Sequence, residues 1–539
     1  MLYSAFVSRQ PELASLHNTL QQILQGQGQV LFISGDAGSG KSTLVREFCR
    51  QSQVENADLG VAFGQSDAET GVGDPNLIFR EILAQLTGDL DSGVAQVVIT
   101  EENASRLRNL FELSVQALVD VGPDLIGVFL PGAGLLAKVG TFAVEKTGWL
   151  DKLGPLVNQK PATGSAGLEQ DHIFEQYTRV LQEMSKQHPI VLVLDDLHWA
   201  DQASISLLFH LGRRINRSRI FIIGTYRPQE LAVGRRSQAT GHMERHPLDK
   251  VVVEFKRYYG DIHIDLNNTA EVEGRHFVDN LLDTEPNTLD AAFRQALFEH
   301  TKGNPLFIIE LLREMQERGD LVRDSNAGWV EKPELRWDAL PARIEGVIQE
   351  RVGRLDDDPR ELLNVASVEG ESFTAEVVAR VQEEDARTLV RIFSRELVQR
   401  HRLVTGQGIQ RLPSGQRLSL YKFNHKLLQN YLYNNLDEVQ RVLAHEDIAY
   451  CLEDIYSQHV DEITVQLAHH FTEAGIRDKS IFYLRQAGER AASQFAFDDA
   501  SDYFSRALGL IEPEKEIEDR FLLLGLRERA LAMPGAGTP

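Results

Sequence analysis

Gly35-Asp36-Ala37-Gly38-Ser39-Gly40-Lys41-Ser42-Thr43 is the stretch that decides the fold of this chain. It fits the phosphate-loop pattern G-x-x-x-x-G-K-[ST] at every fixed position. An apolar run at 29–34 precedes it and is typical of a buried strand, while residues 43–49 have the spacing of an opening helix. Glycines let backbone N–H groups turn towards phosphate oxygens, and a helix N-terminus adds partial positive charge. The stretch therefore predicts a nucleotide-binding loop between a strand and a helix.

Two side chains of this loop have roles that the pattern implies. Lys41 reaches the terminal phosphates of a nucleotide, and the Ser42 hydroxyl ligates Mg2+. The expected cofactors are therefore ATP or ADP together with Mg2+. The loop residues expected to bind the nucleotide are Gly35, Asp36, Ala37, Gly38, Ser39, Gly40, Lys41, Ser42 and Thr43.

Length and charge limit the classes of protein to which the chain can belong. Its 539 residues predict about three or four domains. The net charge of -23 argues against a dedicated nucleic-acid binder, which usually presents a basic face. The only cysteines, Cys49 and Cys451, lie far apart, and no signal peptide is visible, so we expect a cytoplasmic protein. The most apolar segment, 125–136, is too short for a membrane anchor.

Strand and helix patterns alternate around the loop. Strand-like runs lie at 59–64, 189–194, 219–225 and 261–266, and helical patterns separate them. This alternation predicts a parallel α/β sheet. The stretch from about 65 to 171 interrupts the alternation, and we expect it to be an insertion.

Two carboxylates close the most apolar of these strands. Asp195 is the expected Mg2+-side carboxylate, and Asp196 is expected to polarise the attacking water. Adjacent strand residues point to opposite sides, so only a local bend brings both to the nucleotide. The competing interpretation is that one of the two caps a helix.

The second half of the chain changes character. Residues 267–319 read as helical, and 320–341 read as a polar linker. Short helices at 343–399, followed by strand-like runs at 402–405 and 418–423, suggest a winged-helix domain. From about 438 onwards the pattern is helical, with small residues spaced as in tetratricopeptide helix pairs. These pairs are few, which favours a chain cut from a longer protein.

The motifs occur in the order seen in STAND ATPases, the signal-transduction P-loop switches of the AAA+ superfamily. The chain resembles that family over nearly its whole length, apart from 65–171. Besides the phosphate loop, the matching motifs are Phe6-Val7-Ser8-Arg9, Leu194-Asp195-Asp196-Leu197-His198-Trp199-Ala200-Asp201, Gly224-Thr225-Tyr226-Arg227-Pro228, Gly303-Asn304-Pro305-Leu306-Phe307 and Phe423-Asn424-His425.

The resemblance implies roles for residues in the α/β part. Val7 and Arg9 match the motif on the adenine side, where Ser8 stands at the position of the family's usual glycine. Arg227 matches the sensor arginine. A fixed cation there would distinguish ATP from ADP by one added charged group.

The resemblance also implies roles in the second half. Pro305 matches the proline that packs on adenine, and His425 matches the winged-helix histidine that touches the ADP β-phosphate in closed states. Lys426 follows it where the family often has Asp.

The expected fold class is an α/β P-loop NTPase of the AAA+ type, followed by helical domains. Its expected parts are a P-loop ATPase domain at 1–266, an all-α lid at 267–335, a winged-helix domain at 336–437 and incomplete TPR-like helical repeats at 438–539.

The implied function is a signal-responsive ATPase switch with slow turnover. Nucleotide state would control opening and homo-oligomeric assembly, and a protein partner or signal ligand would bind the C-terminal repeats. The alternative is a nucleic-acid-binding AAA+ loader that uses the winged helix. Its nearest support is the locally basic stretch 395–402.

Overall fold

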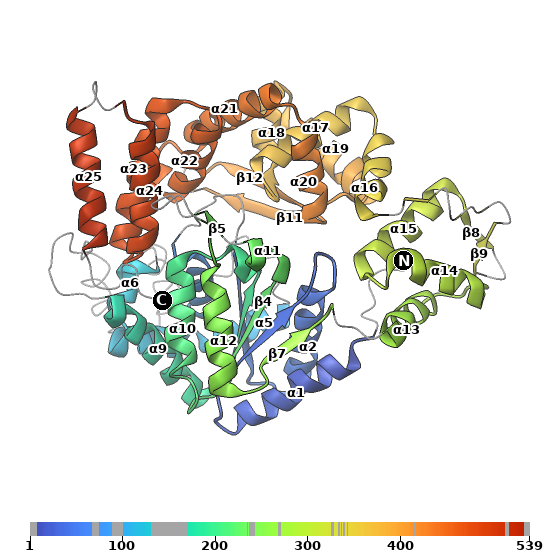
Figure 1. Ribbon diagram of the computed structural model, residues 1–539, viewed down its shortest axis with the longest axis horizontal. Helices are drawn as coiled ribbons and strands as arrows, with labels where there is room; N and C mark the ends of the chain where they lie inside the picture. The colour runs from blue at the N-terminus through green and yellow to red at the C-terminus, as the bar shows by residue number, and fades with distance from the viewer. Residues whose placement is uncertain are drawn as a thin grey trace.

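A computed structural model describes most of the chain. The described residues are 8–66, 75–88, 101–130, 170–233, 235–236, 243–267, 271–324, 328–332, 335, 337, 340–341, 343–412, 415–512 and 517–532. An α/β part lies at the bottom of Figure 1, three helices lie beside it, and the C-terminal helices lie across its top.

The central sheet has five parallel strands in the order β2-β3-β4-β1-β7. Its inner strands are apolar and buried on both faces, as parallel sheets covered by helices require. The carboxyl ends of β1, β3 and β4 therefore meet at one edge. The strands are β1 (Gln29–Ser34), β2 (Gly60–Gln65), β3 (Ile190–Asp195), β4 (Ile220–Tyr226) and β7 (His263–Asp265).

Alternate residues of each strand enter two different hydrophobic cores. In β3, Val191 and Val193 pack with α1 and α2, whereas Ile190, Leu192 and Leu194 pack with the helices on the opposite face. This two-sided packing fixes the register of the strands. The flanking helices are α1 (Gln10–Leu24), α2 (Lys41–Glu55), α9 (Gln170–Gln187), α10 (Gln202–Gly212) and α12 (Pro247–Tyr259).

The described part of 65–171 packs as part of this α/β core. Its helices α3 and α5 share one hydrophobic cluster with β1, β3 and β4. The Gln85 side chain also accepts a hydrogen bond from the Phe63 N–H, at 2.9 Å, and so ties α3 to β2. These helices cover the sheet, and the limits of the expected insertion stay a prediction. The helices are α3 (Leu77–Leu86), α5 (Glu101–Val121) and α6 (Leu125–Val128).

The region expected to be an all-α lid and a polar linker also contains a β-hairpin. Strands β8 (Leu321–Asp324) and β9 (Gly328–Glu331) pair antiparallel, and the Trp329 N–H donates to Pro286 O at 2.9 Å. The hairpin depends on this contact with a distant loop, which a local polar pattern does not reveal. The helices of the region are α13 (Glu271–Leu282), α14 (Ala291–Thr301) and α15 (Pro305–Arg318).

A second, antiparallel sheet with strand order β10-β12-β11 follows. Its strands are β10 (Ser372–Thr374), β11 (Val404–Arg411) and β12 (Arg417–Phe423). The elements around it are α16 (Ile344–Gly353), α17 (Asp357–Glu369), α18 (Ala375–Val381), α19 (Ala386–Ile392), the π-helical segment η4 (Phe393–Arg400) and α20 (Lys426–Asn435).

The C-terminal helices pack in sequence as a row of antiparallel neighbours (Figure 1). Small residues bring them close together: a Cβ added at Gly488 would lie 2.5 Å from the Phe504 ring. The expected combination of a P-loop fold with helical repeats is therefore confirmed. The helices are α21 (Glu438–Ile455), α22 (Thr464–Glu473), α23 (Arg477–Ser493), α24 (Phe497–Leu510) and α25 (Ile517–Leu531).

The remaining elements are short. Among the described residues, we find no helix that combines the length and the apolar character needed to cross a membrane. The short elements are η2 (Leu197–Trp199), α11 (Pro228–Val233), β5 (Arg235–Arg236), β6 (Met243–Glu244) and η5 (Val460–Ile463).

Replacing Phe255 by alanine tests the packing of the α/β core. Its fully buried ring stacks on Phe32 and on Phe209, with ring centroids 6.3 and 5.8 Å away. We expect Phe255→Ala to lower the free energy of unfolding by about 3–5 kcal/mol. Val253→Ala, on the exposed side of the same helix, should change it by less than about 0.5 kcal/mol. Urea denaturation followed by circular dichroism measures both, and equal shifts of the midpoint would contradict the packing.

Glu369 makes the stability of the second sheet depend on pH. Burial raises the pKa of Glu369 to about 8, although hydrogen bonds from the Thr374 N–H and hydroxyl oppose the rise. Between its ordinary pKa of 4.5 and about 8, the folded protein keeps a proton that the unfolded chain has released. Stability should therefore fall as the pH rises through this window. We expect urea midpoints at pH 5 and pH 8 to differ less in Glu369→Gln than in the wild type; an unchanged difference would rule Glu369 out.

Candidate functional site

The phosphate loop connects the end of β1 to the first turn of α2. Gly38 and Gly40 adopt φ angles of 75° and 91°, in the left-handed region that glycine enters without strain. These angles allow successive N–H groups to face one concave space at the N-terminus of α2. The loop thus has the backbone geometry of an anion cradle.

Lys41 lies folded over this loop. Its ammonium donates to Gly35 O at 2.7 Å and to Asp36 O at 3.0 Å. Burial lowers the pKa of Lys41, while the nearby charge of Asp196 opposes this shift. The side chain is thereby held where the loop would receive phosphate groups.

Asp195 joins the loop helix to two strands. One carboxylate oxygen accepts from the Ser42 hydroxyl at 2.8 Å, and the other accepts from the Thr225 hydroxyl at 2.5 Å. A hydroxyl and a carboxylate are hard oxygen ligands, which Mg2+ prefers. Ser42 and Asp195 thus fit the metal expected from the sequence. Thr225 was not among the expected site residues. Its position, as a polar residue near the end of an apolar strand, could have identified it.

Asp196 supplies the bend that two neighbouring carboxylates need. Its φ of 56° and ψ of 44° place it in the left-handed region, and its N–H donates to the Thr225 hydroxyl at 2.9 Å. Burial and the Asp195 charge raise the pKa of Asp196 to about 6, although the charges of Arg227 and Lys41 act in the opposite direction. Asp196 therefore lies in the same electrostatic environment as the loop lysine.

Arg227 follows β4 and lies near both groups. Its charge lowers the pKa of Lys41 and of Asp196. Its Nε is buried and has no hydrogen-bond partner among the described residues. The structure thus brings together five of the expected residues, namely Lys41, Ser42, Asp195, Asp196 and Arg227.

The expected adenine side is only partly described. Val7 lies outside the described residues. Arg9 contacts the loop through Ser39 O, at 3.5 Å, and Ser8 has a φ of 68°, a region that favours the family's usual glycine. A pocket of about 350 Å3 lies between this segment and α13. It is lined by Ser8, Arg9, Gln10, Pro11, Glu12, Gly274, His276, Phe277, Asn280 and Gly303.

Pro305 is the first residue of α15 and lies next to the phosphate loop. The neighbouring Leu306 N–H donates to Gly38 O at 3.3 Å. Gly303 lines the pocket on the adenine side, but Pro305 is not among the lining residues. Its packing on adenine stays a prediction.

Among the described residues, His425 makes its side-chain contact with α15 and not with the phosphate loop. Its Nε2 lies 3.3 Å from Glu310 Oε1, and Glu310 also pairs with Arg351 and Arg313. Burial alone would raise the pKa of Glu310, but the His425 hydrogen bond and the two arginines lower it to about 2. Glu310 was not expected from the sequence, because an acidic residue within a helix gives no local sign of burial.

Comparison with known proteins supports the α/β assignment. Residues 5–223 match the family model described as the AAA ATPase domain. An uncharacterized protein of Rhizobium meliloti (strain 1021) is 23% identical over 513 residues, which cover 94% of this chain and 42% of the relative. The chain thus spans less than half the length of that relative. This match supports the ATPase-domain part of the expected STAND-class P-loop ATPase.

Two solved structures show a distant likeness. One is a STAND protein with a tetratricopeptide repeat sensor from Pyrococcus horikoshii, with 13% identity, a TM-score of 0.42, and 98% of this chain and 65% of that chain covered. The other is the Drosophila origin recognition complex bound to DNA, with 11% identity, a TM-score of 0.31, and 80% and 89% covered. At these TM-scores, neither likeness bears on the function.

Lys41→Ala should weaken nucleotide binding by the loop. Losing a charged hydrogen-bond donor to phosphate should weaken binding of a fluorescent ATP analogue by roughly 100-fold. Arg50→Ala removes only an exposed pair with Glu47 on the same helix and serves as the control. Wild-type affinity in Lys41→Ala would remove this lysine from the site.

Proposed function

We propose that this chain, which carries an AAA ATPase domain over residues 5–223, is a signal-responsive regulatory ATPase switch. It binds ATP and ADP with Mg2+, hydrolyses ATP slowly, and couples the nucleotide state to opening and homo-oligomeric assembly. The observation that carries the proposal is the hydrogen bond from Ser42 to Asp195, because it aligns the loop helix with the acidic end of β3.

Each site residue has a separate role in the proposed hydrolysis of ATP. Lys41 and Arg227 neutralise charge on the terminal phosphates, and Asp196 accepts the proton of the attacking water. Because burial raises its pKa to about 6, Asp196 is a better proton acceptor than an exposed aspartate. When bound at Ser42 and Asp195, Mg2+ adds positive charge to the phosphates.

Contacts between the two halves of the chain support a closed resting state. Lys422 of β12 donates to the Gln65 side chain, at the end of β2, at 3.4 Å. The Lys426 ammonium lies 5.0 Å from the centre of the Trp199 ring, just beyond Asp196. Moving a closed population from 1:99 to 99:1 takes about 5.5 kcal/mol of differential nucleotide affinity. Because these contacts lie near the phosphate loop, a change of nucleotide can alter them and so contribute part of this free-energy difference.

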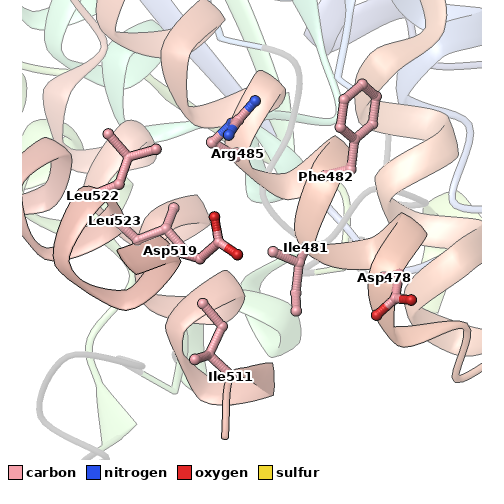
Figure 2. A pocket seen from close by; sticks show the side chains of 8 residues that line it. All are labelled: Asp478, Ile481, Phe482, Arg485, Ile511, Asp519, Leu522 and Leu523. Atoms are coloured by element: carbon pink, nitrogen blue, oxygen red, sulfur yellow. The ribbon is translucent and has the colours of Figure 1, made fainter. Parts of the chain in front are cut away.

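We assign the input to the C-terminal helical repeats. A pocket of about 240 Å3 opens between α23 and α25, with the Asp519 carboxylate pointing into the space between the helices (Figure 2). Its apolar side chains and three charged groups suit a protein segment or a small ligand. The lining residues are Asp478, Ile481, Phe482, Arg485, Ile511, Asp519, Leu522 and Leu523.

We retain the expected division into ATPase, lid, winged-helix and TPR-like parts as a proposal. The antiparallel sheet formed by β10, β12 and β11 and the paired C-terminal helices are consistent with the last two. We also propose a cytoplasmic location, since both cysteines are buried and unpaired, as in a reducing compartment.

Asp196→Asn separates binding from hydrolysis. An amide keeps the shape of the side chain but cannot accept the proton, so phosphate release should slow by about 100-fold or more while ATP still binds. Release of inorganic phosphate and titration of a fluorescent ATP analogue measure the two effects. Unchanged turnover would remove Asp196 from catalysis.

The same variant tests assembly. Asp196→Asn loaded with ATP should form particles of larger mass than the wild-type protein loaded with ADP, because the variant holds the open state. Mass photometry at equal protein concentrations gives the comparison. A monomer in both nucleotide states would contradict the assembly switch.

A further inference from the structure

The first turn of α15 lies directly on the phosphate loop. The Asn304 side-chain amide donates to Ala37 O at 3.3 Å, and the Leu306 N–H donates to Gly38 O, also at 3.3 Å. The Asn304 side-chain Oδ1 accepts a hydrogen bond from the Phe307 N–H at 3.1 Å and thereby caps the helix. One side chain thus joins the loop to the start of α15.

These two contacts set the orientation of two peptide groups in the loop. A trans peptide is planar, so its C=O and the next N–H point in opposite directions. With the carbonyls of Ala37 and Gly38 held by α15, the N–H groups of Gly38 and Ser39 are turned away from that helix. The docked helix therefore fixes the direction of the Gly38 N–H, whereas the Ser39 N–H donates to Asp36 O at 3.2 Å.

The phosphate loop and the first turn of α15 are in such close contact that a side chain at Gly38 would not fit between them. A Cβ added at Gly38 would lie 2.4 Å from the Leu306 Cβ. Leu306 itself is buried. Small movements of α15 therefore must displace the loop as well.

The middle of the same helix is anchored in the second half of the chain. Buried Glu310 pairs with Arg351 of α16 and lies 3.3 Å from His425 at the start of α20. One turn further along, Glu314 pairs with Arg354. A rigid helix thus connects the phosphate loop with two helices beyond it.

We propose that Asn304 is a positioning residue of the phosphate loop, through which α15 couples the orientation of the loop donors to α16 and α20. Asn304 acts by holding the Ala37 carbonyl, and nucleotide binding in turn favours the docked position of α15. The inference rests on the proposed nucleotide-binding function.

Asn304→Ser is the variant that tests this role. Serine caps a helix about as well as asparagine, but it has no amide donor for the Ala37 carbonyl. Losing one hydrogen bond that orients the loop should weaken binding of a fluorescent ATP analogue about fivefold, with the melting temperature unchanged. Asp290→Ser is the matched control, because Asp290 caps α14 in the same way, through the Phe293 N–H.

Asn304→Asp is the second variant. Aspartate can still accept the Phe307 N–H and cap α15, but it has no amide to donate to the Ala37 carbonyl. Its affinity for the ATP analogue should therefore fall at least as much as in Asn304→Ser, even if serine lowers the melting temperature. Hydrogen exchange supplies an independent readout: ADP, which favours the closed state, should protect α20 in the wild type and in Asp290→Ser, and less so in Asn304→Ser at saturating ADP.

The outcomes distinguish the two proposals. Wild-type affinity and protection in both Asn304 variants would overturn the positioning role while leaving the nucleotide site intact. Equal losses in Asn304→Ser and Asp290→Ser would also overturn it, since they would reflect only capping. If the wild-type protein binds no ATP analogue at all, the proposed function is overturned and this inference with it.

Discussion

The hydrogen bonds that Asp195 accepts from Ser42 and Thr225 connect the helix after the phosphate loop with the ends of β3 and β4. They fix the start of α2 against the ends of β3 and β4, because one carboxylate has two oxygens and each is used. The strand order β3-β4-β1 makes this possible, since parallel strands present their carboxyl ends at one edge. At that edge lie the loop glycines after β1, the bend at Asp196 after β3, and Arg227 after β4.

The sequence predicted much of this arrangement because its signals are local. The strand at 29–34, the loop glycines and the apolar run ending at Asp195 each combine a short pattern with a fixed geometry. Asp201 caps the following helix, because its carboxylate accepts the Ser204 N–H at 2.8 Å. Buried strands and helix caps depend on neighbours in the sequence, so their positions could be predicted to within one or two residues.

The features that sequence did not predict depend on distant partners. The hairpin of β8 and β9 contacts Pro286, and Glu310 is buried where α15 meets Arg351 and His425 of other elements. The packing of α3 and α5 on the sheet was not predicted, because no local pattern shows which helices cover a sheet. The bridging role of Asn304 was likewise hidden, since a helix cap in the sequence does not reveal a second partner.

The corner between α23 and α24 also lies against the α/β part: the Asn76 amide donates to Gln494 O at 3.5 Å, across 418 positions of sequence, and Phe495 packs on the core beneath. Synthesis on the ribosome therefore completes the ATPase part long before this contact can form. Domains fold in order as they emerge, and distant contacts form late. The α/β part can therefore fold before the C-terminal helices restrain it.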